Sequence, residues 1–192
     1  MQAFDYVITL MSFVYALAIA HVLATAGDII GAWSRVRFSW LNAAWMLFEL
    51  LAILAWWIGL WGARHAPTWN IANIAELFVL AIILYLEARV ICIRVPLDGV
   101  VDMQRFHDEE SRKYIVIYVV LAAATVGLNI QARGGYQVDV ADTIAKNNAV
   151  LAMLVLSVAG SIFSSRRGQA AIAIGLFVTW IWYFGTLQGA LA

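Results

Sequence analysis

The first residues that could do chemistry lie in a stretch apolar enough for a lipid bilayer. The segment AIAHVLATAGDIIGAW, residues 18–33, contains His21 and Asp28. These two residues are seven apart, so they share one face of a helix, and Thr25 lies between them. Ionisable side chains inside a membrane usually mark a proton or ion pathway. The pattern makes His21 and Asp28 candidates for such a site.

A second apolar stretch carries one carboxylate. Asn42, Glu49 and Trp56 are spaced by seven and share a helix face. Glu49 and His21 both fall near mid-membrane, where an isolated charge costs about 2.5 kcal/mol or more. Protonation, pairing with His21 or a water-filled cavity would each remove this cost. We expect Glu49 to face the bundle interior with His21 as its first partner, either as a proton relay or as a static hydrogen bond.

The third apolar stretch has two acids on one face. Glu76 and Glu87 are eleven residues apart, and Asn73 joins them on that face. They lie about 16 Å apart along a helix, too far to share one ion. They are therefore interpreted as two successive stations on a path.

Two further polar residues, Tyr85 and Arg89, are expected on the opposite face of this third stretch, together with Cys92. Arg89 is near the end of the stretch, so its side chain can extend to the lipid headgroups. Pairing with Asp28, at similar depth, is the alternative.

The elements that hold these residues are predicted to be six membrane-spanning helices. The chain has 192 residues, of which 64% are hydrophobic and only 12% charged, whereas soluble domains carry about a quarter charged residues. Backbone groups in lipid must be satisfied within a helix, which predicts an all-α integral membrane bundle forming a single membrane domain over residues 1–192. The predicted helices are residues 6–33, 39–62, 70–93, 114–131, 147–163 and 170–188.

Basic residues are distributed unequally between the predicted connections. One side of the membrane receives eight: Arg35, Arg37, Arg94, Arg105, Arg112, Lys113, Arg166 and Arg167. The other side receives Arg64, Arg133 and Lys146. Because cytoplasmic loops carry the excess of Lys and Arg, both termini are predicted to be non-cytoplasmic, with residues 94–113 as a cytoplasmic loop.

Part of that loop has a helical pattern of its own. Val100, Met103 and Phe106 recur at helical spacing, which predicts a short helix on the membrane surface. The following run, residues 107–110, is His-Asp-Glu-Glu. Consecutive residues point in different directions around a helix, so we interpret this run as a solvated acidic turn and expect no metal site.

Small residues at regular spacing favour close helix packing. Gly27 and Gly31 have the GxxxG spacing, and a stripe on the fifth predicted helix is a plausible subunit contact. The members of that stripe are Ser157, Gly160, Ser161 and Ser164. We therefore expect a homo-oligomer or a subunit of a larger membrane complex, in contact with the lipid bilayer. The formal net charge of zero gives no reason to expect nucleic-acid binding.

Two functions fit this sequence. The first is a proton or small-cation channel or transporter that uses the polar cluster of the first three helices. The second is a non-catalytic membrane subunit or scaffold. No enzymatic activity and no cofactor are expected, because no catalytic motif occurs and His21 alone cannot provide bis-histidine haem ligation. His21, Asp28, Glu49, Glu76, Glu87 and Arg89 are the site candidates, with Thr25, Asn42, Asn73 and Tyr85 in support.

The order of three segments carries a resemblance. SFVYALAIAHVLATAGDII, SWLNAAWMLFELLAILAWW and VPLDGVVDMQRFHDEESRKY occur in sequence along the chain. Together they resemble a family of small bacterial membrane proteins with six transmembrane helices and no known activity. The resemblance implies a bacterial cytoplasmic (inner) membrane as the location.

Overall fold

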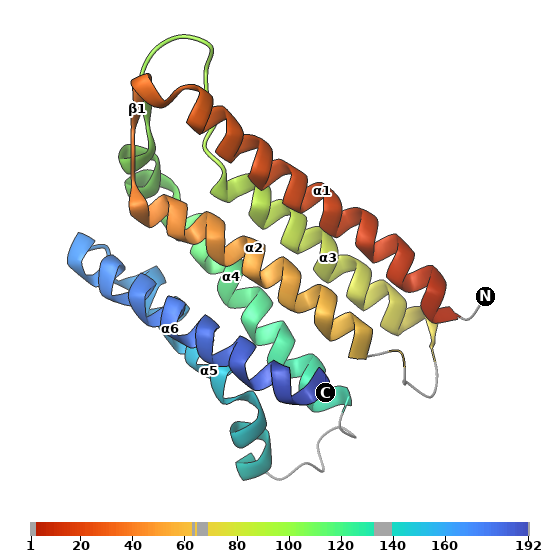
Figure 1. The fold of residues 1–192 in the computed structure, drawn as a ribbon. Helices are drawn as coiled ribbons and strands as arrows, with labels where there is room; N and C mark the ends of the chain where they lie inside the picture. The colour runs from red at the N-terminus through yellow and green to blue at the C-terminus, as the bar shows by residue number, and fades with distance from the viewer. Residues whose placement is uncertain (1–2, 63, 65–68, 133–139, 192) are drawn as a thin grey trace. The chain divides into compact units, whose positions relative to one another are not determined.

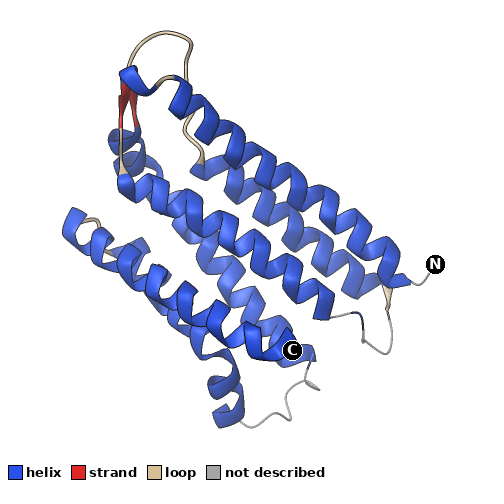
Figure 2. Ribbon diagram, viewed as in Figure 1, coloured by secondary structure: helices blue, strands red, loops and turns tan. Residues whose placement is uncertain are grey.

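The computed structural model describes residues 3–62, 64, 69–132 and 140–191. In those residues the chain forms six α-helices and one pair of two-residue strands (Figures 1 and 2). The helices are α1 (Ala3–Gly31), α2 (Trp40–Gly62), α3 (Ile71–Ile91), α4 (Met103–Ala132), α5 (Val140–Ile162) and α6 (Arg166–Leu191).

The predicted all-helical chain is confirmed, and five of the described helices are long and apolar enough to cross a membrane. These are α1, α2, α4, α5 and α6. The remaining helix, α3, has 21 residues and carries Glu76, Glu87 and Arg89. Arg133 and residues 133–139 of the predicted connection at residues 132–146 lie outside the described residues.

The chain divides into two compact units, Met1–Glu110 and Ser111–Ala192. In the first unit, α1, α2 and α3 pack against one another, and α2 runs antiparallel to both neighbours (Figure 1). The core between these helices is large and almost entirely apolar. Its fully buried side chains include Met11, Leu41, Trp45, Phe48, Ile53, Leu84 and Ile91.

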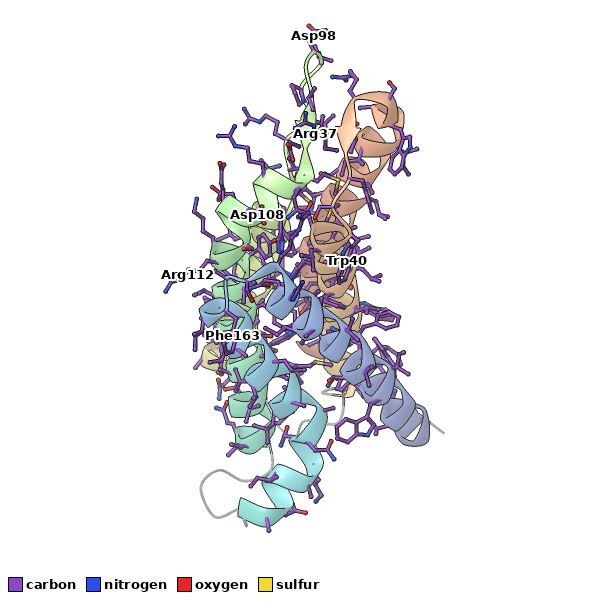
Figure 3. All side chains as sticks on the ribbon, turned by 90° about the vertical axis from the view of Figure 1, so that its left-hand side faces the viewer. Arg37, Trp40, Asp98, Asp108, Arg112 and Phe163 are labelled. Atoms are coloured by element: carbon purple, nitrogen blue, oxygen red, sulfur yellow. The ribbon has the colours of Figure 1, made fainter. Side chains whose placement is uncertain are left out.

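A short parallel strand pair fastens one end of this three-helix unit. β1 (Val36–Arg37) follows a 3₁₀ turn after α1, and it pairs with β2 (Val101–Asp102), the segment just before α4. Arg35 adds to this closure, because its guanidinium donates to the carbonyls of Gly99 at 2.8 Å and Pro96 at 3.3 Å. Figure 3 shows Asp98 at the tip of the loop that this closure holds.

α4 begins at Met103, eleven residues before the predicted start, so the prediction of a surface helix and acidic turn in the loop was wrong. The apolar spacing of Met103 and Phe106 belongs to the first turn of this long helix. Met103 and His107 are buried, whereas Asp108 is exposed. Asp102 precedes the helix, and its carboxylate accepts the backbone N–H of Arg105 at 2.9 Å. A polar N-cap can therefore start α4 well before its apolar part.

The second unit contains the rest of α4 with α5 and α6. α5 and α6 form a hairpin, in which Gln169 donates from one amide nitrogen to the carbonyls of Gly160 at 2.6 Å and Phe163 at 2.5 Å. A Cβ added at Gly160 would lie 3.5 Å from Ile172 and 3.6 Å from Ile115. Gly160 thus marks a close approach between elements of this unit.

The stripe predicted on the fifth helix is therefore used partly within the chain. Ser157 is fully buried and donates to the carbonyl of Met153 at 2.7 Å, and Gly160 packs as described above. Ser164 is exposed. Two of the four small residues are unavailable to a neighbouring subunit, because helices of the same unit already cover them.

Candidate functional site

The buried face of α1 is centred on Thr25. Ala18, Val22, Thr25 and Ile29 are all buried at helical spacing. His21 lies at the edge of this face and is half-buried, whereas Asp28 is exposed. The face that packs is thus rotated from the one predicted: it is centred on Thr25, leaves His21 at its edge and excludes Asp28. The seven-residue spacing of His21 and Asp28 could not reveal this, because Ala18 and Thr25 have the same spacing.

The same rotation affects the GxxxG pair. Gly27 and Gly31 are exposed, and a Cβ added at either would meet no atom within 4 Å. They therefore provide no close approach between helices of this unit. The close approach comes instead from alanines such as Ala18, Ala81 and Ala88, which are completely buried.

Two carboxyl groups meet inside the three-helix unit. Glu49 of α2 and Glu87 of α3 are both completely buried, and their side chains interact directly with each other. Among the described residues, no donor satisfies hydrogen-bond geometry with any oxygen of either carboxyl group. No basic side chain contributes to the interactions found for either acid. This Glu49–Glu87 pair is the most unusual feature of the core.

The pair has a simple electrostatic consequence. Two like unit charges 4 Å apart in a protein interior repel by about 4 kcal/mol, and each buried charge also loses its hydration. Two adjacent carboxyl groups without a counter-ion therefore avoid being ionised together. A proton shared between the oxygens, or a small cation bound by them, removes the repulsion.

The predicted contact between His21 and Glu49 does not form. The imidazole of His21 instead lies against Arg89, whose Nη1 is 3.1 Å from Nδ1 and 3.3 Å from Nε2. Arg89 is exposed, so the guanidinium and the imidazole both lie at the edge of the unit and leave the acids alone in its interior. Matching depth placed His21 and Glu49 together, but His21 lies at the edge of the face that packs and not at its centre.

Polar side chains continue from the Glu49–Glu87 pair toward the strand-paired end. Cys92 interacts with the side chain of Thr25 and electrostatically with Glu49. Asn42, which is completely buried, donates to the carbonyl of Ile91 at 3.2 Å, and its own side-chain oxygen finds no donor among the described residues. Thr25, Cys92 and Asn42 therefore lie between the carboxyl pair and the strand-paired end of the unit.

Ser39 extends this polar line to the surface. It is buried and donates to the amide oxygen of Gln104 at 3.1 Å. Gln104 in turn donates to Asp108 at 2.9 Å, and Figure 3 shows Asp108 on the first turns of α4. Sequence reasoning missed Ser39 and Gln104 because they lie at helix ends, where polar residues are common, and it placed Cys92 on the face opposite Glu87.

The described residues toward the opposite end of the unit are mostly apolar, with Tyr15 and Ser12 as exceptions; Ser12 accepts from the indole N–H of Trp57 at 3.4 Å. Met11, Ile53 and Ala81 are completely buried on that side of the carboxyl pair. The end itself is covered by aromatic rings, since Phe4 lies 6.3 Å from Trp61 and 6.0 Å from Trp69 between ring centroids. Among the described residues, the polar line that begins at the pair leads toward the strand-paired end.

The remaining candidates lie outside this cluster. Glu76 is exposed, and it does not join Glu87 in the core although the two share a helix face. Asn73 is half-buried near the start of α3, where its backbone N–H donates to the side chain of Asn70 at 2.8 Å. Tyr85 is half-buried. Asp28 is exposed, and the predicted alternative of an Arg89–Asp28 pair is replaced by the Arg89–His21 contact.

No set of three or more metal-binding side chains occurs in the part of the chain that the structure describes. Two carboxyl groups alone suit a proton or a weakly held monovalent cation better than a tightly bound metal, which takes more ligands. Comparison with family models, with curated proteins and with solved structures finds no match for this chain.

Proposed function

We propose that this chain is a proton-translocating membrane protein in which the Glu49–Glu87 pair is the proton-binding site. The observation that carries this proposal is the direct interaction of two completely buried carboxyl groups with no basic partner. A structural ion pair would place a cation beside each acid, and His21 and Arg89 are available but contact each other. Acids retained in a membrane interior without that neutralisation favour a role in proton exchange.

The chemistry needs only one mobile proton. A protonated Glu49 donates its O–H to an ionised Glu87, or the reverse, and the proton leaves or enters as the environment of the pair changes. No covalent bond other than O–H forms or breaks. A small cation such as Na⁺, which also prefers oxygen ligands, competes for the same oxygens.

The proposal includes six membrane spans in a bacterial cytoplasmic membrane. α3 has 21 residues and so is about 32 Å long, close to the thickness of the hydrocarbon core. It packs antiparallel to α2, a helix apolar enough to span. With α3 as a span, the excess of basic residues places both termini on the non-cytoplasmic side.

The experiment is a proton-flux assay in vesicles of reconstituted protein. A pH-sensitive dye inside the vesicles reports proton entry when a potassium diffusion potential is applied. We expect wild-type protein to carry protons, and Glu49→Gln and Glu87→Gln to reduce the flux to that of protein-free vesicles, because an amide does not exchange protons in this way. Glu76→Gln is the matched control, since Glu76 is an exposed acid on α3, and it should retain the wild-type flux.

Each outcome separates the proposal from its alternatives. Flux that requires Na⁺ and is insensitive to pH would replace the proton by a cation at the same pair. Wild-type vesicles without flux, with folded protein, would leave the non-catalytic membrane subunit or scaffold as the better function. The detergent-corrected mass of the same preparation tests the proposed homo-oligomer against the 21.2 kDa of one chain.

A further inference from the structure

The Glu49–Glu87 pair has very different surroundings toward the two ends of the three-helix unit. Toward the strand-paired end, polar groups follow one another from the half-buried Cys92 and the buried Thr25 to the buried Asn42 and Ser39. Toward the other end the buried side chains of the described residues are apolar apart from Tyr15, and an aromatic cluster of Phe4, Trp61 and Trp69 lies at that end. This asymmetry indicates the end of the unit from which a proton can reach the carboxyl pair.

Asn42 is the central residue of the polar side. Its side-chain amide nitrogen donates to the carbonyl of Ile91, but its oxygen is a buried acceptor for which no described residue supplies a donor. Buried polar atoms in proteins almost always have a hydrogen-bond partner, and ordered water commonly provides it. Asn42 is thus a suitable anchor for water between the pair and the surface.

Side chains from other elements lie between Asn42 and Glu49, and others lie between Asn42 and the surface. Asn42 and Glu49 are seven residues apart, about 10 Å along the helix. Thr25 of α1 and Cys92 at the end of α3 interact with each other, and Cys92 interacts with Glu49. On the outer side of Asn42, Ser39 bonds to Gln104, which bonds to the exposed Asp108.

We propose that the carboxyl pair exchanges protons with one side of the membrane only, through a polar half-path lined by Thr25, Asn42 and Ser39. The half-path opens at the end where β1 and β2 pair. The other side is closed by Met11, Ile53 and the aromatic cluster of Phe4, Trp61 and Trp69. This inference rests on the proposed proton-binding function and adds its direction: in the structure the buried polar groups lead from the pair to one side, and transport requires a second state in which the aromatic end opens.

The experiment maps water access with a charged, membrane-impermeant thiol reagent (MTSET) on full-length protein in vesicles of defined orientation. Cys92 is first replaced by serine. Asn42→Cys probes the half-path, Thr25→Cys probes it independently if Asn42→Cys fails to fold, and Ile53→Cys is the buried control on the closed side. The reagent is added from each side in turn, and labelling is measured by mass spectrometry.

We expect Asn42→Cys and Thr25→Cys to be labelled from the side of the strand pair and not from the other, and Ile53→Cys to react far more slowly from either side. Absence of labelling at both half-path positions would overturn the inference, as would labelling of Ile53→Cys from the aromatic side at the rate seen for Asn42→Cys from the strand-paired side. Labelling does not depend on flux. Loss of flux with an intact labelling pattern would therefore reject the proposed function and leave the half-path, whereas flux with the wrong pattern would do the opposite.

Discussion

Asn42 and Glu49 illustrate two ways in which α2 carries a polar side chain through an apolar bundle. The side-chain amide nitrogen of Asn42 donates a hydrogen bond to the carbonyl of Ile91. This carbonyl lies at the end of α3, where the helix itself provides no donor. Glu49 instead meets a second acid. The first arrangement stabilises the contact between two helices, whereas the second creates a site that needs a proton or a cation.

Replacing Asn42 by alanine should destabilise the protein. The change leaves the carbonyl of Ile91 buried without its donor, and such a group costs about 1–3 kcal/mol. We expect the thermal unfolding midpoint in detergent to fall. Thr186→Ala, an exposed position, should change the stability by no more than about 0.5 kcal/mol. Equal midpoints for the two variants would show that the Asn42 contact contributes nothing to stability.

The residues of the site could be predicted by type but not by partner. Glu49, Glu87, Asn42 and Thr25 all stand out as polar groups in apolar sequence, and the structure buries all four. Spacing fixes which residues share a helix face, but it does not fix which face turns inward. For that reason the partner of Glu49 was expected on α1, where His21 has a suitable depth, and is found on α3.

At the scale of the element, the start of α4 shows that apolar patterns do not locate the polar end of a helix. The helix contains Asp108, Glu109 and Glu110 in its first third, so a search for apolar segments finds only its later part. Local hydrogen bonds extend it, because Asp102 caps the first turn and Arg105 pairs with Glu109 at 2.7 Å. Helix positions were therefore predictable from hydrophobicity, whereas helix ends depended on polar side chains.

The cap at Asp102 makes the start of α4 sensitive to acid. The pKa of Asp102 is lowered from its ordinary value of 3.8, first because the backbone N–H of Arg105 bonds to the carboxylate and also because Arg37 lies 3.2 Å away. A carboxylate with a lowered folded-state pKa stabilises above its unfolded value, and this stabilisation disappears as the pH falls through the folded value. Protection of the Arg105 amide should thus decrease below about pH 3.8.

Hydrogen exchange measured between pH 2.5 and 6 tests this behaviour. Asp102→Asn keeps a capping oxygen that does not titrate, so the protection factor at Arg105 should no longer depend on pH in this window. Asp102→Ala removes the cap, and protection should be low at every pH. The same pH dependence in wild type and Asp102→Asn would contradict the assignment of this effect to Asp102.

At the scale of the whole molecule, the prediction concerns the number of spans and their orientation. Ser34 and Asp98 lie in the two connections that the strand pair joins, so both should face the same side if α3 crosses the membrane. In a Cys92→Ser background, an impermeant maleimide applied to intact cells should label Thr186→Cys. Ser34→Cys and Asp98→Cys should react only after permeabilisation.

Two results would change this description. Labelling of Ser34→Cys and Asp98→Cys from opposite sides would mean that α3 does not cross the bilayer. Labelling of Ser34→Cys but not Thr186→Cys in intact cells would reverse the orientation and exchange the two sides throughout. A reversed orientation would leave the carboxyl pair and its polar neighbours within the three-helix unit unaffected, whereas the first result would contradict the strand pair that joins the two connections.

The strand pair also has a consequence for biosynthesis. β1 is translated long before its partner, because Val36 pairs with Val101, a residue 65 positions later in the chain. The two helices that carry Glu49 and Glu87 are therefore synthesised before the second strand exists. A nascent chain that ends before Val101 would contain the carboxyl pair with the adjoining end of the unit unfastened. The strand-paired end of the unit can close only after about ten further residues beyond α3 have been translated.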